Sequence, residues 1–172
     1  IDHCLVGSEM CIRDSMNGWE YGTNLNYLKN ISKYWITKYN WKKFENKINS
    51  FKNYKTKVED INLHFIFEKS KNPNSKPLLL LHGWPGSITE FLDIIPRLAH
   101  PEKFGGKIED GFDIIVPSLP GFGFSSQIKK ALGPRKIGKI LNKFMVKNLG
   151  YKNYYVQGGD WGATIAGWIA LD

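Results

Sequence analysis

The chain has 172 residues, 42% of them hydrophobic, and its 24 basic and 16 acidic residues give a net charge of +8. This length is enough for one sizeable core. Only Arg13, Arg97 and Arg135 among the basic residues are arginines, the residue that nucleic-acid sites favour, so we expect no nucleic-acid partner and a lysine-rich solvated surface. No apolar run approaches the about 18 residues of a membrane-spanning helix. We therefore expect a soluble, cytoplasmic chain, with membrane association left to segments outside it.

The first residues differ from everything that follows. Residues 1–15 contain both cysteines, Cys4 and Cys11, and show neither helical nor strand periodicity. We predict that this stretch is a non-native scar segment and leave it out of the fold. Two cysteines at this place do not make a disulfide framework.

Residues 17–70 are rich in regularly spaced aromatic and aliphatic side chains. One stripe repeats at three- and four-residue steps after a Thr23/Asn24 cap and predicts a helix. A shorter stripe predicts a second helix, and an alternating run predicts a half-buried strand. We expect all of these side chains to lie in a core. The three sets are Leu25, Leu28, Ile31, Trp35 and Tyr39; Trp41, Phe44 and Ile48; and Ile61, Leu63, Phe65 and Phe67.

A continuous apolar run at residues 77–81 is typical of a strand buried on both faces of a parallel sheet. It leads directly into the loop His82-Gly83-Trp84-Pro85-Gly86-Ser87. A backbone N–H in such a loop can stabilise a developing negative charge. Because Pro85 has no N–H, Trp84 is the better candidate donor. We expect His82 to be a buried, hydrogen-bonded residue that shapes the loop.

The next segments contain two helices and a strand. Residues 87–90 match a capping box, which predicts a helix that begins there and turns the apolar residues from Phe91 to Ile95 toward a core. Residues 112–117 predict another buried strand, followed by a Pro/Gly loop at 118–126. Gly133-Pro134 opens a helix that ends at Gly150. Functional loops collect at the carboxyl ends of parallel strands, so we expect the loops at 82–87 and 118–126 to lie at one edge of the sheet.

The run Gly158-Gly159-Asp160-Trp161-Gly162 has the form of a nucleophile elbow with an aspartate at its centre. Strand-forming residues precede it and apolar helix formers follow it, which predicts the strand, sharp turn and helix of this motif. The turn strains its central residue and requires small residues two positions away on either side. A glycine-rich turn with an Asx cap is the alternative interpretation, and the loop at 82–87 favours the elbow.

Asp160 is therefore the candidate catalytic nucleophile, because an aspartate is ionised at neutral pH and needs no base to attack. The backbone amides of Trp84 and Trp161 are the candidate oxyanion hole. We predict no metal site and no cofactor. The residues predicted to shape the two loops are His82, Gly83, Pro85, Gly86, Gly158 and Gly162.

The motifs at 82–87, 120–125 and 158–162, with the aromatic segment before them, resemble the epoxide hydrolases of the microsomal and juvenile-hormone type. The resemblance covers roughly residues 17–172. It implies an α/β-hydrolase fold, a mostly parallel sheet with helices on both faces, that is truncated after the elbow and preceded by a helical extension. Residues 17–70 would be the N-terminal segment of that family, and residues 76–172 the first part of the hydrolase domain.

The resemblance also implies a reaction, the opening of a small-molecule epoxide by water to a vicinal diol through an ester on Asp160. The acid, the histidine base and the lid tyrosines of that family follow the elbow, whereas His3, His64, His82 and His100 all precede it, so we expect the chain alone to be inactive. A haloalkane dehalogenase with the same nucleophile and a non-catalytic binding protein remain alternatives. Localisation stays open, since full-length relatives of this type can be anchored in the endoplasmic reticulum membrane.

Overall fold

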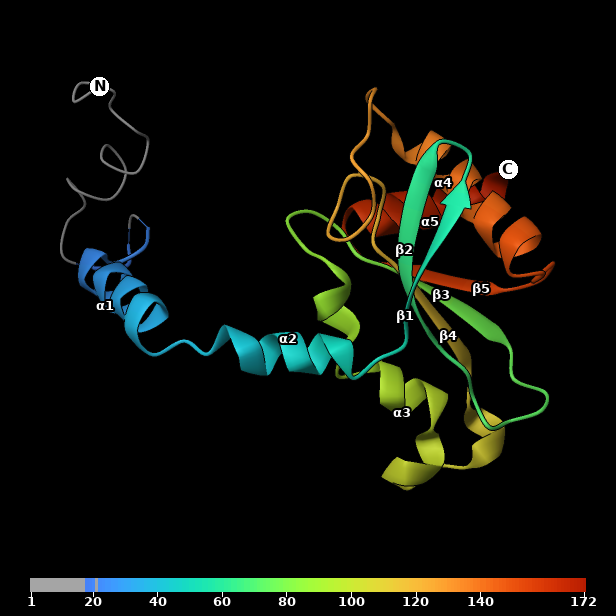
Figure 1. The fold of residues 1–172 in the computed structure, drawn as a ribbon, viewed down its shortest axis with the longest axis horizontal. Coiled ribbons are helices and arrows are strands. Elements are labelled where there is room, and N and C mark those ends of the chain that lie inside the picture. Colours follow the sequence, from blue (N-terminus) through green and yellow to red (C-terminus); the bar gives the residue numbers. More distant parts are fainter. Residues whose placement is uncertain (1–17, 21) are drawn as a thin grey trace. The chain divides into compact units, whose positions relative to one another are not determined.

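The computed structural model describes residues 18–20 and 22–172, so the scar segment predicted at 1–15 lies outside the described residues. The described residues fall into two units, those up to residue 45 and those from 46 to 172 (Figure 1). None of the helices described in these ranges combines the length and apolar character that crossing a bilayer requires.

The first unit contains the predicted helix α1, Leu25–Thr37. Its cap is Asn24, whose side chain accepts a hydrogen bond from the Tyr27 N–H at 3.1 Å. The described part of its own unit buries no residue of α1 and leaves Trp35 71% exposed, so the expected burial of the apolar stripe stays a prediction. A helix needs a second layer to bury one face. Within the described part of its own unit, the Trp19 ring provides one contact, 5.0 Å from the Tyr27 ring.

The second unit is built on a five-stranded mixed sheet in the order β1-β2-β4-β3-β5. Strands β1 and β2 pair antiparallel, as do β2 and β4, while β3 runs parallel to both β4 and β5. The predicted α/β class and its four strands are confirmed, and β1 was missed because its sequence NYKTKV carries no apolar pattern. The strands are β1 Asn53–Val58, β2 Ile61–Glu68, β3 Pro77–Leu81, β4 Asp113–Pro117 and β5 Tyr155–Gly158.

Most helices of this unit lie in the segments that connect its strands. The α-helices are α2 Trp41–Asn49, which begins in the first unit, α3 Ile95–Ala99, α4 Pro134–Lys143 and α5 Trp161–Leu171. Three 3-10 helices are η2 Ile88–Phe91, η3 Pro101–Phe104 and η4 Ile108–Asp110, and the π-helix η5 Phe144–Asn148 continues α4.

One predicted helix is broken into two pieces. The capping box at Ser87 is present, but it opens only the short η2, and α3 starts separately at Ile95. Pro96 explains the break, since it has no N–H and its ring would meet the carbonyl of residue 92 in a continuous α-helix. Leu92 and Ile95 are nevertheless buried as expected, whereas Ile94 is exposed.

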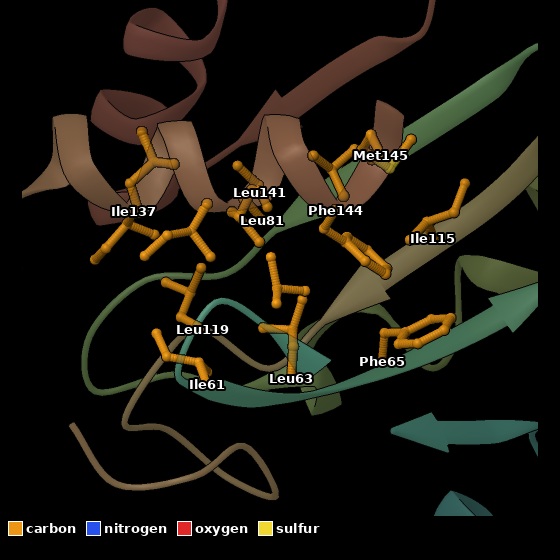
Figure 2. Packing of buried hydrophobic residues seen from close by; sticks show 14 residues of the cluster. Ile61, Leu63, Phe65, Leu81, Ile115, Leu119, Ile137, Leu141, Phe144 and Met145 are labelled. Carbon is orange, nitrogen blue, oxygen red and sulfur yellow. The ribbon is translucent and has the colours of Figure 1, made fainter. Parts of the chain in front are cut away.

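The core lies between the sheet and α4 (Figure 2). The Phe144 ring packs edge-on against the Phe65 ring of β2 at 4.8 Å, and Ile165 of α5 joins the same cluster. This packing fixes the end of β3 and the start of α5, the two elements that carry the predicted loops. Cluster members labelled in Figure 2 are Ile61, Leu63, Phe65, Leu81, Ile115, Leu119, Ile137, Leu141, Phe144 and Met145.

Strand β2 is buried on both faces, whereas its alternating sequence predicted one exposed face. His64, on the face expected to be exposed, is only 3% exposed because the loop after β4 covers it. Its ring makes hydrogen bonds to Ser118 and Asn53. Burial, with a smaller contribution from the positive charge of Lys55, lowers the pKa of His64 to about 4.

This shift predicts an acid-dependent loss of stability. Between pH 6.5, the ordinary pKa of histidine, and about 4, the unfolded chain binds a proton at His64 that the folded chain does not, so the free energy of unfolding falls as the pH falls through that window. The full shift corresponds to roughly 3 kcal/mol. Urea unfolding at pH 7 and pH 4.5 should show a smaller loss for His64→Gln than for the wild type. Equal losses in the two proteins would contradict the assignment.

Candidate active site

The elbow holds Asp160 in a strained conformation between β5 and α5. Its backbone angles are φ 51° and ψ −124°, a left-handed region that side-chain-bearing residues rarely adopt. Such a residue costs on the order of 1–3 kcal/mol and persists only where the surrounding structure enforces it. As the N-cap residue of α5, Asp160 makes no capping bond with its own side chain, so the carboxylate is left free to face the neighbouring loop.

The glycines on either side of Asp160 allow this conformation. A Cβ on Gly158 would collide with the backbone of Gly162, and a Cβ on Gly162 would collide with the carbonyl of Leu81 at the end of β3. The Gly159 N–H donates to that same Leu81 carbonyl at 3.3 Å. The elbow is therefore pressed directly against the strand that carries the 82–87 loop.

The Trp84 amide and the Asp160 carboxylate meet across these two loops. The Trp84 N–H donates to Asp160 Oδ1 at 2.8 Å. The Trp161 backbone N–H is the second group that lowers the pKa of this carboxyl. These two N–H groups hold the pKa of Asp160 below its usual range, and the Trp84 group has the larger effect. Both predicted donors thus converge on the predicted nucleophile. The Trp84 and Trp161 side chains point outward and are 68% and 45% exposed.

Gly83 lets the two loops come this close. A Cβ at this position would overlap the Asp160 side chain. Gly86 has a similar constraint, because a Cβ there would overlap the Glu90 carboxylate that accepts the Ser87 N–H at 3.2 Å. Pro85 lies between them and offers no N–H, so the loop directs a single amide, that of Trp84, toward Asp160.

His82 is fully buried and both of its ring nitrogens are engaged. Nε2 accepts the Leu119 N–H at 3.1 Å, and Nδ1 lies 3.0 Å from the Gly83 carbonyl. Since an amide N–H can only donate, Nε2 is unprotonated and Nδ1 carries the hydrogen. Burial lowers the pKa of His82, which keeps the ring neutral. Phe122 packs edge-on against the ring at 5.3 Å. This histidine is placed to hold the loop.

The loop after β4 brings together residues that the sequence placed at one edge of the sheet. Leu119 and Phe122 of this loop contact His82, as the shared edge of parallel β3 and β4 requires. Sequence reasoning did not single out His64, which contacts the same loop from β2. Its position in an alternating strand carried no signal for burial.

The arrangement can support attack by a carboxylate. One oxygen, Oδ1, is fixed by the Trp84 amide. The second oxygen can approach an electrophilic carbon, after which Oδ1 becomes the carbonyl oxygen of an ester. If water then attacks that carbonyl, the negative charge develops on the oxygen that the Trp84 amide already binds.

Two known protein families together match residues 7–172 of this chain. The family described as "Epoxide hydrolase N terminus" matches residues 7–91, and the family described as "alpha/beta hydrolase fold" matches residues 76–172. Epoxide hydrolase 1 of Oryctolagus cuniculus is 43% identical over 152 residues, which cover 86% of this chain and 33% of the relative. Juvenile hormone epoxide hydrolase 1 of Ctenocephalides felis is 41% identical over 151 residues, covering 86% and 32%.

A solved structure agrees with these relatives. The crystal structure of juvenile hormone epoxide hydrolase from Bombyx mori superposes with a TM-score of 0.79 at 39% identity and covers 90% of this chain and 41% of that chain. The chain therefore spans about a third of the length of the curated relatives it matches. These matches give no support to the dehalogenase and binding-protein alternatives.

The close approach at Gly83 can be tested by adding one methyl group. Gly83→Ala should push the Asp160 carboxyl away from the Trp84 amide, and the Trp84 N–H resonance should lose the downfield shift of a charge-assisted hydrogen bond. Gly159→Ala is the matched control, because a Cβ there meets nothing within 4 Å. A Trp84 resonance that is the same in Gly83→Ala and wild type would contradict this geometry.

Proposed function

This chain belongs to the epoxide hydrolases of the α/β-hydrolase fold, and we propose that the complete protein opens small-molecule epoxides to vicinal diols through an ester on Asp160. The observation that carries the proposal is the Trp84 N–H bound to Asp160 Oδ1 at 2.8 Å in the elbow. It supports Asp160 as the nucleophile and the Trp84 and Trp161 amides as the oxyanion hole.

In the first step the free oxygen of Asp160 attacks an epoxide carbon, a carbon–oxygen ester bond forms and the epoxide C–O bond breaks. The ring oxygen leaves as an alkoxide, which in this chain takes a proton from solvent water. The lowered pKa of Asp160 keeps its carboxyl ionised, so no base is needed for this attack. The Trp84 amide holds Oδ1 in place, which leaves the other oxygen to react.

In the second step water attacks the ester carbonyl, and the two amides stabilise the charge that develops on Oδ1. Losing one such donor typically costs roughly 3–4 kcal/mol of transition-state stabilisation. The water needs a base to take its proton. Both ring nitrogens of His64 and of His82 make hydrogen bonds. His100 pairs with Glu68, the last residue of β2, away from Ser118. Among the described residues no histidine is placed for this role. We assign the base to a part of the relatives that lies outside the region matched by this chain.

The nucleophile can be identified by covalent labelling. We expect incubation of the chain with styrene oxide, followed by acid quench and peptide mass spectrometry, to show one added epoxide on the peptide that contains Asp160. Asp160→Asn should give no adduct, since a neutral amide is a poor nucleophile. Asp93→Asn, which removes an exposed carboxylate elsewhere on the surface, should be labelled like the wild type. An adduct on another peptide would sink the assignment.

Because no described histidine is placed as the base, we expect each chain to form at most one ester on Asp160. Because the ester forms without a base but hydrolyses slowly without one, the 172-residue chain should consume at most one equivalent of styrene oxide and release no more than a trace of diol. Quantifying the diol by chromatography over time provides the test. Sustained release beyond one equivalent would show that a base for the second step lies within this chain.

A further inference from the structure

The oxyanion donor is connected to the loop after β4 through His82. The Leu119 N–H donates to His82 Nε2 at 3.1 Å, and His82 Nδ1–H donates to the Gly83 carbonyl at 3.0 Å. The next amide along the chain is that of Trp84, which binds Asp160. The position of this amide therefore depends on where Leu119 lies.

Leu119 is in turn fixed by its neighbour Ser118, which is held by His64 of β2. The Ser118 N–H donates to the His64 carbonyl at 2.9 Å, and Ser118 Oγ lies 2.9 Å from His64 Nδ1. A second tie runs through Ser125, whose Oγ accepts the His64 N–H at 3.0 Å and donates to the Ser118 carbonyl at 2.7 Å. His64 thus contacts both ends of the loop.

The direction of the bonds at His64 is set by Asn53, which follows α2. Asn53 Nδ2 donates to the carbonyls of Ile48 and Phe51, so its Oδ1 is the atom that faces His64 Nε2 at 3.0 Å. An amide oxygen can only accept, which places the hydrogen of the ring on Nε2. Nδ1 then accepts from the Ser118 hydroxyl. Each donor and acceptor in this series has one consistent assignment.

The series runs through the interior of the second unit. His64, His82, Ser118 and Leu119 are each at most 3% exposed. A buried polar group that loses its partner has no bulk water to replace it, so the loss costs free energy and the group shifts to find another partner. A displacement at His64 is therefore passed on to the loop.

We propose that His64 is a positioning residue for the Asp160 site, acting through Ser118, Leu119 and His82 to hold the Trp84 N–H against the carboxylate. The proposal rests on the function proposed above and extends it. It makes the segment that precedes β3, from the end of α2 to β2, part of the machinery that sets the reaction geometry. It also gives a physical reason why a buried histidine lies between Leu63 and Phe65 in β2.

The test compares three His64 and Ser118 variants with a matched histidine control. His64→Leu removes both ring hydrogen bonds at similar volume, His64→Gln keeps an amide that can donate and accept, and Ser118→Ala removes only the hydroxyl between the ring and the loop. His100→Gln is the control, since His100 is also largely buried but its described side-chain hydrogen bond goes to Glu68 of β2 and not to the loop. All are made in the 172-residue chain.

Two readouts separate positioning from a general loss of stability. The ring nitrogen shifts of His82 report its tautomer, and the Trp84 amide shift reports its bond to Asp160. The rate of Asp160 labelling by styrene oxide reports the consequence. His64→Leu should lose the downfield Trp84 shift and be labelled about tenfold more slowly. Ser118→Ala should change both in the same direction, His64→Gln should recover part of the rate, and His100→Gln should match the wild type.

A folded His64→Leu chain with the wild-type Trp84 shift and labelling rate would overturn the proposal. If that variant does not fold, Ser118→Ala decides, and unchanged shift and rate in this variant would overturn it equally. A wild-type chain that is not labelled at all would defeat the proposed function instead. In that case the response of the His82 and Trp84 shifts to His64 still decides the positioning role.

Discussion

The hydrogen bond from the Trp84 N–H to Asp160 Oδ1 is the contact on which the site depends. It joins the loops that follow two adjacent parallel strands, β3 and β5, and it is made at an exposed position where water competes for both partners. Such a bond persists only if the backbone on both sides is already in place. The rest of the unit supplies that constraint, with glycine contacts on the Asp160 side and His82 on the Trp84 side.

The strain at Asp160 is offset by packing a few residues away. Leu81 lies directly before His82, Ile165 lies just over one turn into α5, and both are completely buried in the cluster beneath the site. Fully burying side chains of this size contributes about 1.5–3 kcal/mol each, comparable to the cost of one left-handed aspartate. The core therefore acts on the chemistry by holding the elbow and its neighbouring loop at a fixed separation.

The parts of this structure that the sequence could predict are those encoded within a few residues. The apolar run of β3, the glycines of the elbow and the absence of an N–H on Pro85 each act locally, and they were enough to place Asp160 and Trp84 together. Pro96 could also have been recognised as a helix break, but the capping box at Ser87 favoured one continuous helix. The division at residue 70 stays a prediction, and the sheet includes β1 and β2, which precede it.

What the sequence could not show depends on contacts between distant residues. The alternation in β2 correctly predicted a strand, but the burial of His64 is caused by Ser118 and its loop, 54 residues later. The stripe of α1 correctly predicted a helix, yet its periodicity alone could not say which layer would cover it, and the described part of its own unit buries no residue of α1. Periodicity reports which face is apolar, and only the assembled fold determines what packs on that face.

The most direct test of the central claim follows the oxygen atoms in a single turnover of the complete protein in ¹⁸O-labelled water. If Asp160 forms an ester and its amide-bound carbonyl is attacked by water, the first diol released takes an unlabelled oxygen from Asp160. The label then appears in the peptide that contains Asp160. Label in the first diol, with none in that peptide, would show that water attacks the epoxide directly and would contradict the role of Asp160 as nucleophile.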